Sequence, residues 1–86
     1  MDILNWPDDR LTRFEVARLI GARALQISLG APVLIKMDET DPLKIAKEEF
    51  KQKIFPMTVK RILPNGSEVV IKIKKAIENW LKEHEV

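Results

Sequence analysis

The chain has 86 residues and a mass of 9.9 kDa; 45% of its residues are hydrophobic, 33% are charged and none is cysteine. This length accommodates one small domain and excludes a multidomain enzyme, and the lack of cysteine excludes disulfides and thiolate metal sites. The net charge of +2 is uneven, because residues 1–50 hold seven Lys/Arg against nine Asp/Glu and residues 51–86 hold eight against four. Such asymmetry favours docking onto a partner or proximity to nucleic acid.

The first ten residues predict an N-terminal arm. Trp6 is followed by Pro7, which cannot continue a helix, so we expect a flexible, extended arm over residues 1–10 and a single domain over residues 11–86. The arm is acidic and lacks the apolar core of a secretory signal. The longest charge-free stretch, residues 24–35, has 12 residues, whereas a membrane span needs about 20. The sequence predicts a cytoplasmic protein without membrane contact.

A first helix is predicted to begin after Thr12 and to run to Leu29. Thr12 and Glu15 have the spacing of a capping box, in which each side chain bonds the other residue's main chain. Gly30 supplies the left-handed residue that ends a helix, and Pro32 forbids its continuation.

Small residues form a trough along this helix, between apolar flanks; the trough consists of Ala17, Gly21, Ala24 and Ser28. A glycine inside a helix costs about 1 kcal/mol relative to alanine, so a close packing contact is expected to offset the cost. Leu19 and Leu29 lie among polar residues on the other side. The contact is either internal packing or a partner interface, and the spacing leaves both open.

A second helix is predicted from Pro42 to Lys53, since Asp41 is a capping carboxylate and proline suits the first helical position. Its inward face should comprise Leu43, Ala46 and Phe50.

From residue 57 the hydrophobic residues recur at every second position, which predicts strands over residues 57–63 and 68–74. Between them, Leu63-Pro64-Asn65-Gly66 predicts a tight turn with a left-handed glycine. A short C-terminal helix follows from the spacing of Ala76, Ile77, Trp80, Leu81 and His84. The predicted fold class is α+β: two helices, a β-hairpin and a short helix.

The sequence lacks the residue patterns that are typical of most catalytic and metal-binding sites. Asp38, Glu39 and Asp41 lack the glycine and distal glutamate of a calcium loop, and the lone His84 has no second ligand. Ser28 lies within a helix without a base in reach, and no glycine-rich loop connects a strand to a helix. We therefore expect no catalytic residue, no cofactor, no metal and no small-molecule substrate.

Nucleic-acid binding is the stronger alternative. A basic cluster lies in the second half of the chain: Lys51, Lys53, Lys60, Arg61, Lys72, Lys74 and Lys75. Such a cluster can contact phosphates, but the strands lack aromatic side chains for base stacking, and charged residues also keep ordinary edge strands soluble. Both interpretations stay open.

Residues 11–32, LTRFEVARLIGARALQISLGAP, closely resemble the signature helix of a family of small RNA polymerase subunits. The family comprises subunit K of archaeal RNA polymerase, bacterial omega and a small subunit shared by the eukaryotic nuclear polymerases. The similarity continues through Asp41-Pro42-Leu43, Ile45-Ala46 and Glu48-Glu49-Phe50, and through the hairpin motif at residues 55–66. It covers residues 11–66 and leaves residues 67–86 as a C-terminal extension without a family pattern.

The resemblance implies an omega-like domain that acts as a non-catalytic subunit, clasps the largest polymerase subunit and promotes assembly and stability of the enzyme in transcription. Nucleic acid would then be contacted only indirectly, through the complex. The residues expected to dock or to shape the docking surface are Thr12, Phe14, Glu15, Ala17, Gly21, Ala24, Leu25 and Ser28, with Arg18, Arg23, Gln26 and Arg61 as polar anchors. The alternative is a free-standing basic nucleic-acid-binding module, whose binding would weaken steeply with salt.

Overall fold

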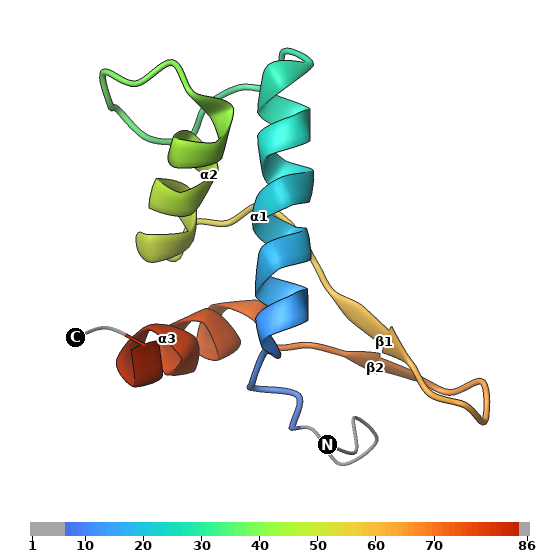
Figure 1. The fold of residues 1–86 in the computed structure, drawn as a ribbon. Coiled ribbons are helices and arrows are strands. Elements are labelled where there is room, and N and C mark those ends of the chain that lie inside the picture. The colour runs from blue at the N-terminus through green and yellow to red at the C-terminus, as the bar shows by residue number, and fades with distance from the viewer. Residues whose placement is uncertain (1–6, 85–86) are drawn as a thin grey trace. The chain divides into compact units, whose positions relative to one another are not determined.

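The fold is taken from a computed structural model, which describes residues 7–84 (Figure 1). Its elements are α1 (Arg13–Ser28), α2 (Pro42–Lys51), β1 (Lys60–Ile62), β2 (Glu68–Val70) and α3 (Ile73–His84). This order confirms the predicted α+β class. The chain divides into two compact units, which we name the helical unit (residues 12–57) and the hairpin unit (residues 1–11 with 58–86).

In the helical unit, α1 begins as the sequence predicts and ends at Ser28, one residue before the predicted end. The Glu15 N–H donates to Thr12 Oγ1 at 3.1 Å, and the Thr12 N–H donates to Glu15 Oε1 at 2.8 Å. The capping box is therefore confirmed. At the other end, Leu29 is the C-cap, and Gly30 takes a φ of +102°, which favours glycine because it has no Cβ.

α2 is two residues shorter than predicted. Asp41 caps it by accepting the Leu43 N–H at 3.0 Å, but Lys53 adopts a φ of +61°, which is incompatible with a right-handed helix. Its buried face consists of Ile45, Ala46, Glu49 and Phe50. The inward placement of Leu43 is wrong, because Leu43 lies about a quarter turn from the centre of that face and is exposed.

The two helices of the helical unit pack against each other and lie side by side in Figure 1. Their buried apolar side chains are Val16 and Leu19 of α1 and Ile45, Ala46 and Phe50 of α2. The Phe55 ring meets the Phe50 ring edge-on, with centroids 5.7 Å apart, a geometry that aromatic pairs prefer.

In the hairpin unit, β1 and β2 pair antiparallel, with Lys60 opposite Val70 and Ile62 opposite Glu68. The turn is confirmed, since Gly66 has a φ of +88° and donates its N–H to the Leu63 carbonyl at 2.9 Å. The strands are shorter than predicted. The Ile71 N–H still donates to the Val59 carbonyl at 2.9 Å, but α3 begins at Ile73 and includes Lys74, so the predicted second strand cannot extend to residue 74.

The predicted C-terminal helix is confirmed as α3, which buries Ala76 and Ile77. Towards its end, the Trp80 and His84 rings stack with centroids 3.6 Å apart. Within residues 7–84, no helix is long and apolar enough to cross a membrane.

The end of the predicted arm contacts the rest of the hairpin unit. The Lys72 N–H donates to the Asp8 carbonyl at 2.8 Å, and the Asn79 side-chain amide donates to the Asp9 carbonyl at 2.8 Å. Arg10 forms an ion pair with Glu83. Residues 1–6 of the arm lie outside the described residues. The flexibility of residues 1–10 and the single-domain organisation of residues 11–86 stay predictions.

Candidate functional site

The two sides of α1 differ in an unusual way. Its buried side carries Val16, Leu19 and the charged Arg23. The outward face, as we name it, comprises the exposed residues Phe14, Ala17, Arg18, Gly21, Leu25, Ser28 and Leu29. Phe14, Leu25 and Leu29 are 75%, 60% and 79% exposed. A surface helix ordinarily presents polar residues to solvent, so the outward face is a candidate docking surface.

Gly21 lies in the middle of the outward face, and a Cβ placed on it would have no atom within 4 Å. Among the described residues of the helical unit, nothing packs closely against this glycine. Within that unit, no packing contact offsets its cost to helix stability, which is about 1 kcal/mol relative to alanine.

The structure brings six of the twelve predicted site residues onto this face. Phe14, Ala17, Arg18, Gly21, Leu25 and Ser28 are exposed there. Ala24 is half-buried beside it, and Thr12 with Glu15 fixes the start of the helix. The Gln26 side chain is exposed and accepts a hydrogen bond from Arg23 Nη1 at 3.2 Å.

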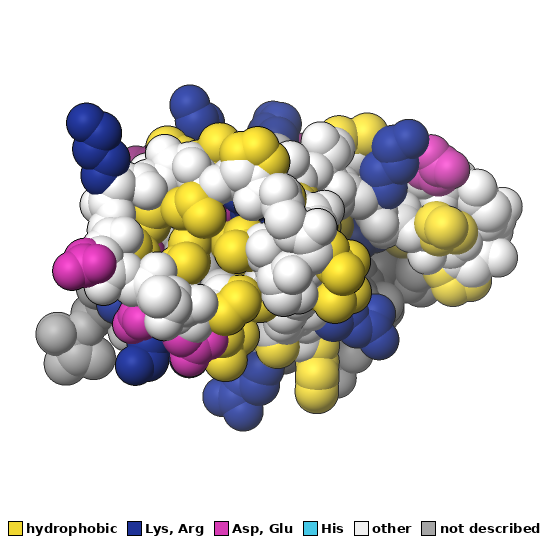
Figure 2. Space-filling view, turned by 90° about the horizontal axis from the view of Figure 1, so that it is seen from above, with side chains coloured by type: hydrophobic (Ala, Val, Ile, Leu, Met, Phe, Trp, Pro, Cys, Tyr) yellow, Lys and Arg dark blue, Asp and Glu magenta, His cyan; other side chains and the backbone are white. Residues whose placement is uncertain are grey.

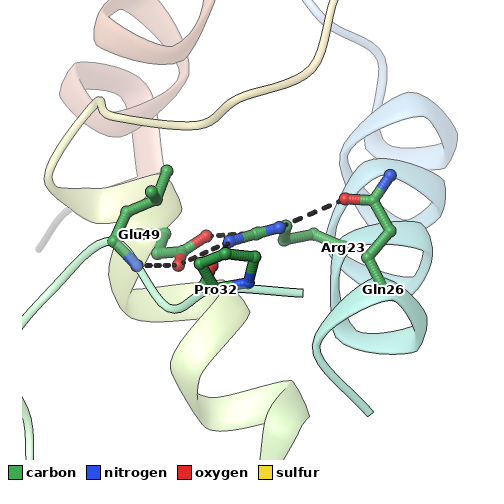
Figure 3. A network of polar contacts seen from close by, with 5 residues as sticks. Arg23, Gln26, Pro32 and Glu49 are labelled. Atoms are coloured by element: carbon green, nitrogen blue, oxygen red, sulfur yellow. Dashed lines mark hydrogen bonds and ion pairs between the residues drawn. The ribbon is translucent and has the colours of Figure 1, made fainter. Parts of the chain in front are cut away.

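Arg23, expected as a polar anchor for a partner, is instead buried and bound to Glu49 of α2 (Figure 3). Arg23 Nε donates to Glu49 Oε1 at 2.6 Å, and Nη2 donates to Glu49 Oε2 at 3.1 Å. The same Nη2 donates to the Pro32 carbonyl at 2.8 Å. This bidentate geometry is the strongest available to a guanidinium and a carboxylate. Contact of Arg23 with a partner would require breaking these bonds.

Glu49 is fully buried and charged. Burial by itself raises the pKa of this carboxyl, but the hydrogen bonds from Arg23 and from the Leu34 N–H, with the Arg23 charge, lower the pKa more, and the net result lies below its ordinary value. The carboxylate is thus held ionised and joins α1, α2 and the segment between them.

Arg61, the other arginine expected as an anchor, is also buried. Its Nη1 donates to the Pro7 carbonyl at 2.8 Å, and its Nη2 donates to the Arg10 carbonyl. These bonds hold residues 7–10 within the hairpin unit. The burial of Arg61 follows from strand alternation, because Lys60 and Ile62 on either side are exposed.

Sequence reasoning missed the role of Glu49. A signal was available, because Glu49 follows Ala46 by three residues and precedes Phe50, which places a carboxylate on an apolar helix face. A charge in that position needs a buried partner. Within residues 7–84, no three His, Asp or Glu side chains are grouped closely enough to hold a metal ion.

Comparison with known proteins assigns the chain to a family. Residues 8–56, which include all of α1 and α2, match the family model described as RNA polymerase Rpb6. The chain belongs to the RNA polymerase Rpb6 family. This confirms the resemblance drawn from residues 11–66, and the matched segment contains the outward face and both Arg23 and Glu49.

Named relatives of this Rpb6 family chain occur in archaea and eukaryotes. The DNA-directed RNA polymerase subunit Rpo6 of Saccharolobus solfataricus is 46% identical over 71 residues, which cover 79% of this chain and 75% of the relative. The Rpo6 subunit of Archaeoglobus fulgidus is 66% identical over 50 residues, covering 58% and 67%. The probable subunit RPABC2 of RNA polymerases I, II and III of Caenorhabditis elegans is 53% identical over 58 residues, covering 66% and 42%.

Proposed function

We propose that this chain is a non-catalytic subunit of DNA-dependent RNA polymerase that clasps the largest subunit and promotes the assembly and stability of the enzyme. Membership of the Rpb6 family supports the assignment to the polymerase. The outward face of α1 is the observation that supports a docking role, because it exposes large apolar side chains on a helix whose other side is already packed.

The energetics favour a partner on this face. Full burial of a Phe or Leu side chain contributes about 1.5–3 kcal/mol, and three such side chains, Phe14, Leu25 and Leu29, are largely exposed. The trough between them, centred on Gly21, would allow a partner main chain or helix to approach closely. Arg18 lies on the same face and supplies a charge-assisted donor for a partner carboxylate.

The alternative, a free-standing nucleic-acid-binding module, is weakened by the state of the basic cluster. Lys60 Nζ lies 3.7 Å from Glu68 and Lys72 Nζ lies 3.9 Å from Asp8, while the Arg61 guanidinium is buried against main-chain carbonyls. Part of the positive charge is therefore paired with carboxylates within the chain, which weakens its attraction for phosphate.

The test is affinity capture of the tagged chain from its native extract, with nuclease treatment and a wash at about 0.5 M salt, where exposed charge contacts are screened. We expect the large polymerase subunits to remain bound. Loss of every protein partner, with nucleic acid retained only at low salt, would support the basic-module alternative.

The Gly21→Leu variant then tests whether the chain docks onto the polymerase through the outward face. Because the space around Gly21 is open in the free chain, we expect the variant to fold and yet to be excluded from the polymerase. Lys47→Leu, on the exposed side of α2, is the matched control and should be incorporated normally. Normal assembly of Gly21→Leu would refute docking through the trough.

A further inference from the structure

The outward face of α1 carries large and small side chains in an order that is complementary to itself. Phe14 and Leu25 are the large exposed apolar residues near its two ends. Ala17, Gly21 and Ser28 are small and are also exposed there. Phe14, Gly21 and Ser28 follow one another at intervals of seven residues, a spacing that keeps side chains on one side of a helix that packs against another helix.

A two-fold axis through Gly21 brings each large residue opposite a small one. When two copies of α1 pack antiparallel about this axis, residues at equal distances on either side of Gly21 lie level with each other. Phe14 of one copy then faces Ser28 of the second copy, and Leu25 faces Ala17. Gly21 faces its own equivalent, where the absence of a Cβ lets the two helices approach closely. Such an interface uses the same surface on both copies, which is the usual geometry of a dimer.

The parallel arrangement of two copies lacks this fit. It would place the Phe14 ring against its own equivalent, and the rings would hold the helices apart where Gly21 leaves space, against the close packing of protein interfaces. It would also bring the two Arg18 guanidinium groups together. In the antiparallel pair, the two Arg18 residues lie six positions apart along the helix axis, or about 9 Å.

The charges at the ends of α1 favour the same antiparallel partner. Arg13 is the first residue of α1 and is exposed, at the end where the helix dipole disfavours a cation. The last turn of α1 holds no basic residue, and Figure 2, which looks down on this end, shows hydrophobic side chains gathered there. In the antiparallel pair, Arg13 of one copy lies level with Leu29 of the other, where the dipole favours a cation.

We propose that the free chain forms a weak homodimer, in which two copies of α1 pack antiparallel about Gly21 through their outward faces. The 16 residues of α1 span about 24 Å. A single pair of helices of this length forms a small contact, below the roughly 1,200 Å² at which stable interfaces begin. The dimer therefore forms at high concentration and dissociates on dilution. The dimer goes beyond the proposed function, and only its competition with polymerase assembly rests on that function.

Analytical ultracentrifugation of the full chain tests the dimer, over concentrations from about 10 µM to about 1 mM. We expect the mean mass to rise from that of one chain, 9.9 kDa, towards twice that value. Gly21→Leu should stay monomeric, because its side chain separates the helices at the axis, and Lys47→Leu on the exposed side of α2 should associate like the wild type. A wild-type mass of one chain at every concentration would overturn the proposal, as would equal association of Gly21→Leu.

Cross-linking tests the direction of the two helices. The chain has no cysteine, so an introduced cysteine reports a single position. A disulfide needs Cα atoms within about 7 Å, so Gly21→Cys at the axis should form a covalent dimer on mild oxidation. Ser28→Cys should not, because its two copies lie 14 positions apart along the axis, or about 21 Å. A mixture of Ala17→Cys and Leu25→Cys, which keeps Gly21, should form the mixed disulfide.

These results separate the dimer from the proposed function. Efficient cross-linking of Ser28→Cys alone would indicate parallel helices and overturn the antiparallel dimer, as would failure of both Gly21→Cys and the mixture to cross-link. A monomeric chain that is still captured with the polymerase would refute the dimer and leave the proposed function intact. A chain that dimerises as described and yet never enters the polymerase would refute the proposed function alone.

Discussion

The solvent sides of α1 and α3 differ in composition, although both helices belong to the same small chain. The exposed side of α3 carries Lys74, Lys75, Lys82 and Glu83, and that of α1 carries Phe14, Gly21, Leu25 and Leu29. α3 therefore has the composition of an ordinary surface helix, whose solvent-exposed side is charged. α1 has the composition of a helix with two packed sides, and among the described residues of the helical unit only one of these sides is packed.

The charge distribution strengthens this contrast. α1 places a guanidinium, Arg23, beside Val16 and Leu19 on its buried side and large apolar groups on its exposed side, which is unusual for a surface helix. The buried guanidinium is tolerated because Glu49 and the Pro32 carbonyl accept its hydrogen bonds, while the Leu34 N–H donates to Glu49. Substitutions on the two sides of α1 should therefore affect different properties: folding on the inward side, and assembly on the outward side.

The largest effect is expected for Arg23→Ala on the inward side. Removal of one member of a buried ion pair leaves the other charge uncompensated and typically costs about 3–5 kcal/mol. Urea unfolding of the free chain measures the loss. Arg18→Ala, on the outward face of the same helix, is the control and should change stability by less than about 0.5 kcal/mol. Equal stabilities for the two variants would remove the distinction between the faces.

Acid should weaken the same pair without a mutation. The folded-state pKa of Glu49 lies below its ordinary value, so at moderately acidic pH the unfolded chain binds more protons than the folded chain. The contribution of Glu49 is fully present above the unfolded-state pKa, about 4.3, and is lost as the pH falls through the folded-state value. Urea titrations of the wild type between pH 6 and pH 3 should show this loss, and Glu49→Gln should show less of it.

Truncation of the outward face should weaken assembly and spare folding. Phe14→Ala and Leu25→Ala each remove a large exposed side chain, and we expect a loss of about 1–3 kcal/mol in binding, equivalent to about ten- to hundredfold in competition for incorporation. The melting temperatures of the free variants should stay near wild type. Lys75→Ala on α3 is the control. A comparable loss from that control would show that the outward face has no special role.

The smallest effect is expected for Gly21→Ala in the free chain. Its Cβ meets open space, so alanine should raise the free energy of unfolding by up to about 1 kcal/mol through helix propensity. A destabilised free chain would show that Gly21 has a packing role within the molecule. Thermal unfolding resolves a shift of this size in a domain of this length.

Local signals predicted most of the fold. The capping box at Thr12 and Glu15, the ending at Gly30, the Asp41 cap and the turn at Gly66 all depend on residues close in sequence. Element ends were less accurate: α2 stops early because Lys53 turns left-handed, and β2 ends because α3 starts at Ile73. Neither boundary has a glycine or proline to mark it.

The site was only partly predictable, because burial depends on residues far apart in sequence. Periodicity placed Phe14, Gly21 and Leu25 on one side of a helix but did not show which side the chain covers. Arg23 was expected on the surface, since its partner Glu49 lies 26 positions away. Arg61 was misplaced for the same reason, because the carbonyls that it binds lie 54 and 51 positions earlier.

The division of the chain into two units also has a consequence for the order of folding. The helical unit is one continuous segment, residues 12–57, whereas the hairpin unit needs both ends of the chain. The bonds from Arg61 and Asn79 to residues 7–10 span 51 to 70 positions, and contacts of such separation close slowly. Contacts within the helical unit join residues that are closer in sequence, so we expect this unit to fold before residues 7–10 find their partners.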